Sequence, residues 1–506
     1  MANIGVSAGS VSRTSGINLS KGTPTASSTV LPSDIGVFTE VNTDNQGSVT
    51  FDTGIQLTSA KAVGDLCGYG SPAYHIARVL FGTSANLGGI PVTFYPIQEA
   101  GSASASTYDV SATGTATGNA THTLVIAGRR FLEGGRYDIN IETGDTTADI
   151  AAKIYDTVSA VLGCPVTATL DSPVTKATLT SKWKGASSVF NVTVDTNGND
   201  VGITYTTDNQ VQGAGVPAVT TALNGIANDT WHTHIINGIS NGDTTLTEFE
   251  AWNGVASNTN PTGRFVGIVA KPAIVFTGAV TKEPEDITSG RRDEMTICIA
   301  PAPGSGGFHF EAAANMVALY APISNSNPHI GCSGQPYPDM PVPSDGVIGN
   351  MSSWSERDRI VKLGCSTVDL QNGAYLVEDM VTTYRPEGEE PPQWRYVRDL
   401  IVDFNIIYGY KILERANVID KVIANSADIV TASNVIKPSQ WKQILFNYAD
   451  SLTDRALIAD PDFMKDSITV AIDSSNPNRL NTEFSYKRTG RALISSTMAF
   501  SYFNFG

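Results

Sequence analysis

The most regular alternation of apolar and polar positions lies in the stretch from residue 391 to residue 472. Apolar side chains recur there at helical spacing, at Val397, Ile401, Phe404, Tyr408 and Ile412. A second stripe follows Pro438 and comprises Trp441, Leu445, Tyr448 and Leu452. Each stripe predicts an amphipathic helix with one buried face. Because alternating apolar residues at 468–472 then predict a strand, we interpret this stretch as a helix-on-sheet core that organises the chain.

Apolar runs elsewhere predict the strands and helices of an α/β domain. The first group consists of strand-like runs at 35–41 and 90–97 and a helical run at 71–81. The second group consists of buried-strand runs at 265–270, 273–280 and 295–302 and a helix at 307–322. A stretch of different composition separates the two groups. The sequence therefore predicts the class α/β (α+β), with a split helix-on-sheet core domain.

The separating stretch predicts an inserted β-rich α+β domain at residues 101–215. Residues 100–120 are low in bulky side chains and predict a linker, and a Gly-rich seam at 211–219 closes the unit. Between them, alternating runs predict strands. Thr146 and Asp149 resemble a capping box, with Asp in place of the usual Glu, and predict a helix start.

Both chain ends differ in character from the core. Residues 1–30 are rich in Ser, Thr and Gly, with isolated apolar residues at Ile4, Val6, Val11, Ile17 and Leu19. They form either a disordered tail or an arm that adds a strand to another subunit's sheet. The C-terminal stretch is apolar and aromatic, with Leu493, Phe500, Tyr502, Phe503 and Phe505. An exposed apolar β segment promotes aggregation in a monomer, so we expect a partner to receive it.

The predicted domain organisation follows from these shifts in composition. It comprises an N-terminal arm (1–30), a first core part (31–100), the insert (101–215), a second core part (216–478) and a C-terminal β arm (479–506). The residues named in the two arms are the candidate subunit interface.

Composition and charge exclude several classes of protein. The chain has 506 residues, of which 41% are hydrophobic and 16% charged, and its net charge is −16. This charge argues against nucleic acid as a partner. The N-terminus lacks the apolar segment of a signal peptide, and no apolar run reaches the ~20 residues that a membrane helix needs. The five cysteines have no zinc or redox spacing and predict buried free thiols.

Candidate catalytic and metal-binding residues are few. Gly5–Gly9 matches G-x-S-x-G, but it lacks the preceding strand and following helix of a nucleophile elbow. Ser305 follows a predicted strand and could bind an oxyanion, but a tight strand-to-helix turn needs the same glycines. His232 and His234 would project to one side of a strand, as metal ligands can, without an evident third ligand. The sequence therefore predicts no catalytic residue, no metal site and no cofactor.

Four stretches of the chain carry a resemblance to a known family. They are the insert runs within 122–185, Arg291–Ser305, Ser355–Gly388 with its TTY ending, and Ile468–Phe500 with its Asn-Pro turn. In order and spacing they resemble the contractile tail sheath proteins of myophages, in particular the Mu-like type. The likeness covers most of residues 101–500.

This resemblance implies a structural protein of the phage virion, assembled in the host bacterial cytoplasm. It implies hexameric rings stacked helically around the tail tube protein, and a contraction that drives the tube through the host envelope. The implied partners are further copies of the chain, linked by strand exchange through both arms, the tail tube protein, the baseplate, and the tail terminator or neck proteins. The seams near residues 101 and 215 would let the insert sit outside without resisting the motion.

Two other functions compete with a sheath subunit. An adhesin or capsid-type host-surface binding protein would suit the Ser/Thr/Gly-rich β insert, but not the two long amphipathic helices. A hydrolase would use Ser305 or the pair His232 and His234.

Overall fold

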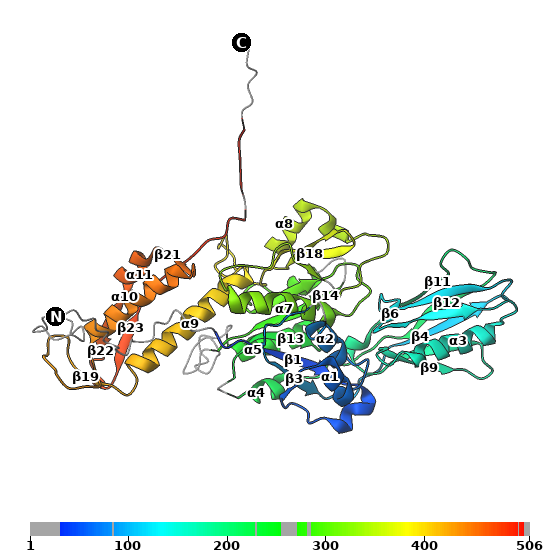
Figure 1. Cartoon of the computed structure of the whole chain (residues 1–506), viewed down its shortest axis with the longest axis horizontal. Coiled ribbons are helices and arrows are strands. Elements are labelled where there is room, and N and C mark those ends of the chain that lie inside the picture. Colours follow the sequence, from blue (N-terminus) through cyan, green and yellow to red (C-terminus); the bar gives the residue numbers. More distant parts are fainter. Residues whose placement is uncertain are drawn as a thin grey trace, which may run out of the picture. The chain divides into compact units, whose positions relative to one another are not determined.

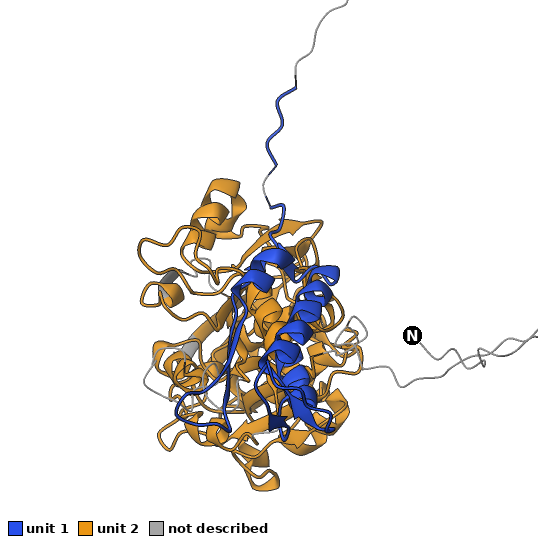
Figure 2. Cartoon of the chain, turned by 90° about the vertical axis from the view of Figure 1, so that its left-hand side faces the viewer, with its two compact units in different colours: residues 1–30, 408–506 blue, residues 31–407 orange. Residues whose placement is uncertain are grey.

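The computed structural model describes residues 31–82, 85–227, 230–254, 271–280, 285–337, 339–493 and 495–499 (Figure 1). The predicted N-terminal arm and the predicted strand at 265–270 lie outside these residues. Contacts divide the chain after Ile407 into two compact units, coloured separately in Figure 2. One unit is residues 31–407, and the other contains the described residues from Tyr408 onward. The domain boundaries expected from the sequence remain predictions.

The largest sheet belongs to the unit of residues 31–407 and has six strands in the order β15-β14-β13-β1-β3-β2. The strands are β1 (Asp34–Glu40), β2 (Ile55–Gln56), β3 (Val92–Ile97), β13 (His232–Gly238), β14 (Ile274–Ala279) and β15 (Ile297–Pro301). Neighbours pair in parallel, except that β2 is antiparallel to β3. Because the chain leaves this sheet after β3 and returns to it at β13, the predicted α/β class and the split core are confirmed.

Helices cover both faces of this sheet. The helices of this unit that precede residue 397 are α1 (Ala60–Cys67), α2 (Pro72–Leu80), α3 (Thr147–Ala160), α4 (Thr220–Asn224), α5 (Asp243–Asn253), α6 (Glu285–Thr288), α7 (His309–Ser326) and α8 (Trp354–Lys362). Helices α2 and α7 pack against each other and against β13. Ile35 lies in register with His234, whose ring is 5.9 Å from that of Tyr320 in α7. Side chains alternate along a strand, so Phe38 faces the other way, where its ring lies 5.4 Å from Phe249 of α5.

The insert between β3 and β13 contains two further sheets, in the orders β12-β4-β10-β9 and β11-β5-β8, with α3 packed against both. Its strands are β4 (Thr107–Thr113), β5 (Ala120–Ile126), β6 (Phe131–Leu132), β7 (Gly135–Arg136), β8 (Asp138–Ile141), β9 (Val166–Leu170), β10 (Lys176–Ser181), β11 (Val192–Asp195) and β12 (Thr204–Val211). The capping box predicted for α3 is confirmed: Asp149 donates its N–H to Thr146 Oγ1 (3.4 Å), and Thr146 donates its N–H to Asp149 Oδ2 (2.9 Å).

The prediction of a linker at residues 100–120 is wrong. Strand β4 lies within that stretch and pairs with both β10 and β12. Its buried side chains include Val110 and Ala112, and Asp109 accepts a hydrogen bond from Thr178 (2.6 Å). Small and polar residues therefore suffice for a strand that is held by partners on both edges.

A small sheet completes this unit beside β15. It has the order β16-β18-β17, formed by β16 (Pro336–Tyr337), β17 (Thr367–Gln371) and β18 (Ala374–Asp379). An antiparallel bridge between Cys298 and Thr382 joins the following segment to the edge of β15. In the part of the chain that the structure describes, no helix combines the length and apolar character needed to cross a bilayer.

Both helices predicted in the C-terminal half are present, but only the second has the single buried face of an amphipathic helix. The first is buried on nearly all sides from Val397 to Ile406, including Arg398, Asp403 and Asn405. The two helices are α9 (Val397–Asn417), which contains the boundary between the units, and α10 (Pro438–Asp454). The other elements after α9 are β19 (Val422–Ile423), β20 (Val435–Ile436), β21 (Ile458–Ala459), α11 (Pro461–Ser467), β22 (Thr469–Ile472), β23 (Leu480–Glu483) and β24 (Lys487–Arg488).

The sheet that α10 contacts is not the main sheet of the molecule. Helix α10 packs on β22, which pairs with β23 alone among the described residues. The interpretation of residues 391–472 as the organising core is therefore wrong, since the largest sheet is built from residues 34–301. A helical stripe reports that one face is buried, and it does not report which element covers that face.

Candidate functional site: the junction between the insert and the sheet

The carboxyl end of β1 is where an open α/β sheet would be expected to bind a ligand. Strand order reverses between β1 and β13, because the chain goes from β1 to β3 on one side and later from β13 to β15 on the other. Residues 182–188 of the insert lie at this end. Thr43, just after β1, donates its N–H to the Lys182 carbonyl (2.9 Å). The Ser187 hydroxyl donates to the carboxyl group of Glu40, the last residue of β1. The chain's own insert therefore occupies this edge.

Trp183 is the largest side chain in this contact, and it is fully buried. Its ring lies 5.4 Å from Phe308 and 6.2 Å from Phe310, both edge-on, and those two rings stack on each other at 4.9 Å. Trp183 Nε1 donates to Ser187 Oγ (2.9 Å), which satisfies the indole N–H. An aromatic side chain of this size contributes much of the apolar area at an interface. Trp183 thus anchors the insert against the start of α7.

Two acidic side chains of the core, Glu40 and Glu99, accept hydrogen bonds from the insert at this edge. Glu99 Oε1 accepts hydrogen bonds from Thr43 Oγ1 (2.6 Å) and from the Lys184 N–H (3.0 Å). Burial raises the pKa of Glu40 to about 8; the hydrogen bond from Ser187 opposes this shift, and the nearby Glu99 adds to it. Glu40 is therefore mostly protonated at neutral pH. Paired carboxylates can serve acid–base chemistry, but both of these side chains are engaged by the insert.

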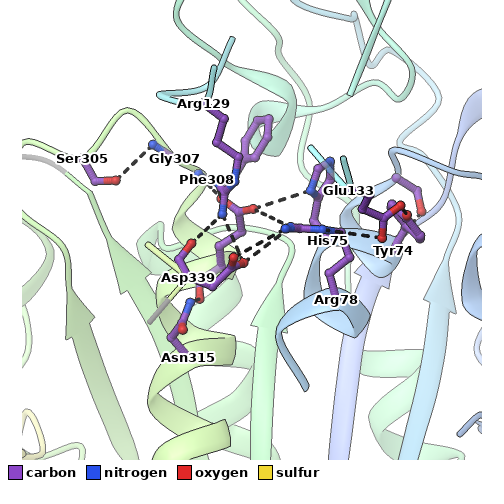
Figure 3. Close-up of polar contacts among 12 residues, drawn as sticks. Tyr74, His75, Arg78, Arg129, Glu133, Ser305, Gly307, Phe308, Asn315 and Asp339 are labelled. Carbon is purple, nitrogen blue, oxygen red and sulfur yellow. Dashed lines mark hydrogen bonds and ion pairs between the residues drawn. The ribbon is translucent and has the colours of Figure 1, made fainter. Parts of the chain in front are cut away.

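A second contact between insert and core is a cluster of charges around Glu311, whose side chain is fully buried (Figure 3). Arg129 of the insert places Nη1 3.1 Å from Glu311 Oε2. Its Nη2 donates to the Asp339 carbonyl (2.6 Å) and lies 3.2 Å from Asp339 Oδ2. From α2, Arg78 Nη1 lies 4.0 Å and His75 Nδ1 lies 3.5 Å from Glu311 Oε1. Figure 3 shows these side chains converging from the insert, α2 and the segment after β16.

The environment keeps Glu311 ionised. Burial alone would raise the pKa of this carboxyl, but Arg129, His75 and Arg78 together lower it to about 2. Burial lowers the pKa of His75, so that ring is neutral at pH 7. Glu311 Oε2 also accepts the N–H of Phe308 (3.0 Å), at the start of α7. A buried carboxylate of this kind is stable only while its cationic partners stay in place.

The backbones of insert and core also come into contact beside this cluster of charges. A Cβ on Gly306 would stand 2.8 Å from the Cα of Gly128 in the insert, so both positions require glycine. Nearby, Tyr74 of α2 donates its hydroxyl to Glu133, and Arg78 Nε lies 3.9 Å from Glu133 Oε1. The junction is thus closed by packing as well as by charge.

Comparison with known proteins gives these features a context. No protein-family model matches the chain. The tail sheath protein of the Mu-like prophage FluMu of Haemophilus influenzae is 24% identical to it over 447 residues, which cover 81% of this chain and 84% of that protein. The chain is a relative of a Mu-like tail sheath protein. The resemblance predicted from the sequence is therefore confirmed.

A solved structure also aligns with this chain. The sheath tail protein of Desulfitobacterium hafniense aligns with 94% of this chain and 100% of its own, with 13% identity and a TM-score of 0.44.

The residues of this chain that were considered for catalysis or metal binding form hydrogen bonds within the fold. Ser305 Oγ donates to the Pro341 carbonyl (2.7 Å) and accepts the Gly307 N–H (3.1 Å), which confirms the predicted tight turn. His232 Nε2 lies 2.7 Å from the Tyr95 hydroxyl. His234 Nε2 lies 3.2 Å from Ser324 Oγ. Within the described residues, no group of three or more His, Cys, Asp or Glu side chains could hold a metal ion.

The cysteines are all buried thiols that form no disulfide bond, as predicted. They are Cys67, Cys164, Cys298, Cys332 and Cys365. Burial raises the pKa of Cys67 and of Cys298 to about 12, so these thiols are protonated at neutral pH.

Most of the candidate interface residues in the arms lie outside the described residues. This holds for Ile4, Val6, Val11, Ile17 and Leu19 and for Phe500, Tyr502, Phe503 and Phe505. Leu493 is described, and its side chain is exposed. The described part of the chain after Thr489 belongs to no helix or strand.

Hydrophobic periodicity does not reveal the junction, although the sequence contains one signal for it. Between Met295 and Pro338, Glu311 is the only Asp, Glu, Lys or Arg, and it begins an otherwise apolar helix. A lone charge in an apolar stretch requires a buried partner. Its partner Arg129 lies 182 residues earlier, and no periodicity connects the two.

Proposed function

We propose that this chain is a structural subunit of a contractile phage tail sheath. In this proposal, subunits polymerise as stacked hexameric rings around the tail tube, and contraction drives the tube through the host envelope. The carrying observation is the similarity to the FluMu tail sheath protein over 81% of the chain. A structural role also fits the sheet edge at β1, where the insert lies in place of a ligand.

Strand exchange between subunits is the proposed means of polymerisation, and the hairpin of β22 and β23 supports it. A two-stranded hairpin is marginally stable by itself, and its outer edges can accept further strands. Trp441 Nε1 donates to Thr482 Oγ1 (3.1 Å), which anchors the hairpin on α10. The proposed donors of the missing strands are the N-terminal arm (1–30) and the part of the C-terminal arm that follows β24, because β23 and β24 already pair within the chain.

The remaining partners follow from the same proposal. They are the tail tube protein, the baseplate, and the tail terminator or neck proteins, with the chain assembled in the host cytoplasm and carried in the virion. The proposal gives the subunit no catalytic role. The turn held by Ser305 and the core hydrogen bonds of His232 and His234 support this.

Negative-stain electron microscopy of the purified full-length chain tests this proposal. We expect rods or tubes, and we expect their loss in variants that lack residues 1–25 or 490–506. Circular dichroism and thermal unfolding of each truncated chain check that it remains folded. Dispersed single particles at all concentrations, or tubes of normal length from both truncated chains, would contradict the proposal. Monomers that bind host cells would favour a surface-binding protein instead.

A further inference from the structure

The two segments that connect the insert to the core, near residues 101 and 215, are held by backbone hydrogen bonds. Ser104 and Ala214 exchange two backbone hydrogen bonds (2.9 and 3.2 Å), which ties the first seam to the second. Gly185 donates its N–H to the Ser104 carbonyl (3.1 Å), and Ala186 donates to the Gly215 carbonyl (2.8 Å). Both seams are therefore fixed to the same segment that carries Trp183. The expectation that the segments near residues 101 and 215 let the insert sit outside without resisting the motion stays a prediction.

We infer that the insert is clamped onto the sheet through Glu311, so that insert and sheet behave as one rigid body. Glu311 is the only carboxylate of the cluster that is fully buried, whereas the side chains of Asp339 and Glu133 are 35% and 44% exposed. It faces Arg129 of the insert and Arg78 of the core at once. One carboxylate thereby joins two elements that are far apart in the sequence.

Loss of the Glu311 charge would act directly on the junction. Arg78 and Arg129 are only 13% and 12% exposed, and without Glu311 the remaining carboxylate near both is that of Asp339. A buried cation without its partner gains stability by reaching water. Arg129 sits in the turn after β5, so a movement of its side chain towards water would loosen that edge of the insert. Glu311 is therefore the side chain that keeps the junction closed.

Hydrogen exchange of the full-length chain measures this opening without reference to whether the chain polymerises. The reporters are two amides that cross the junction: Thr43, which donates to Lys182, and Lys184, which donates to Glu99. The reference amides lie inside the insert, in β10 where Leu179 pairs with Tyr108 of β4. All samples are compared in the same assembly state.

The variant Glu311→Gln removes the charge and keeps an oxygen that can accept the Phe308 N–H. We expect exchange at Thr43 and Lys184 to accelerate about tenfold or more, with little change at Leu179, because the opening is local. Unchanged exchange at the two junction amides would overturn the inference. Equal acceleration at all amides would overturn it too, since Glu311 would then support global stability.

A second pair of variants tests the same junction by sterics rather than charge. Gly306→Ala places a Cβ 2.8 Å from the Gly128 Cα and should accelerate the same two junction amides. Gly101→Ala is the matched control, since a Cβ there meets nothing within 4 Å. Acceleration by the control, or none by Gly306→Ala, would contradict a clamped junction.

Discussion

Ser187 of the insert donates its hydroxyl hydrogen bond to Glu40, the residue with which β1 ends in the core. Glu40 is fully buried, and burial raises its pKa from 4.5 to about 8. Between pH 4.5 and about pH 8, Glu40 holds a proton in the folded chain and releases it in the unfolded chain. The contribution of Glu40 to stability is therefore greatest below pH 4.5 and is lost as the pH rises towards 8.

The variant Glu40→Gln tests this relationship, because a neutral amide does not titrate. We expect the free energy of unfolding of the original chain, relative to the variant, to fall by up to about 1.4 kcal/mol per pH unit between pH 5 and pH 8. Denaturant unfolding of both chains at several pH values gives this difference. Comparison with the variant is essential, since Glu250 also has a pKa raised to about 8 by burial. Parallel pH profiles for the two chains would show that Glu40 is not the titrating group.

The capping box of α3 gives a prediction about the stability of the insert. Thr146→Ala removes the hydroxyl that accepts the Asp149 N–H, and loss of such a cap costs about 1 kcal/mol. We expect faster hydrogen exchange along α3 in the full-length chain. Ser159→Ala, at an exposed position near the end of the same helix, is the control and should leave exchange nearly unchanged. Equal effects from both variants would argue against the cap.

Features set by neighbouring residues were predictable from the sequence. The cap at Thr146 depends on a residue three positions away, and the stripes of α9 and α10 repeat within a few turns. Strand β4 was missed because its buried residues, Val110 and Ala112, are small, and its stability comes from pairing on both edges. Strand composition alone does not report such partners.

The candidate site was beyond the reach of sequence patterns for a related reason. Glu40 and Ser187 are separated by 147 residues, and Glu311 and Arg129 by 182. Each pair forms only in the folded chain, where residues of the insert come next to the core. The sequence predicted that an insert exists, but the residues that fix it to the core depend on the tertiary fold.

The hairpin of β22 and β23 allows a sharp test of strand exchange, which rests on the proposed sheath function. Asp473 donates its N–H to the Arg479 carbonyl (2.9 Å) at the closed end of the hairpin. Backbone N–H groups alternate in direction along a strand. The N–H of Ala471 therefore points towards β23, and the N–H of Val470 points to the outer edge of β22. Proline at position 470 would therefore remove a donor from the edge without removing one from the hairpin.

We expect Val470→Pro to fold normally and to lose the ability to form tubes in electron micrographs. Ala471→Pro is the contrasting variant, because it removes a donor from within the hairpin and should also lower its protection from hydrogen exchange. Leu480→Pro makes the equivalent change on the outer edge of β23, since Leu480 lies opposite Ile472 and its N–H, like that of Val470, points outward. If tubes form from Val470→Pro but not from Leu480→Pro, the incoming strand pairs with β23. Tubes from both variants would mean that neither edge accepts a strand, and polymerisation would then require a different contact.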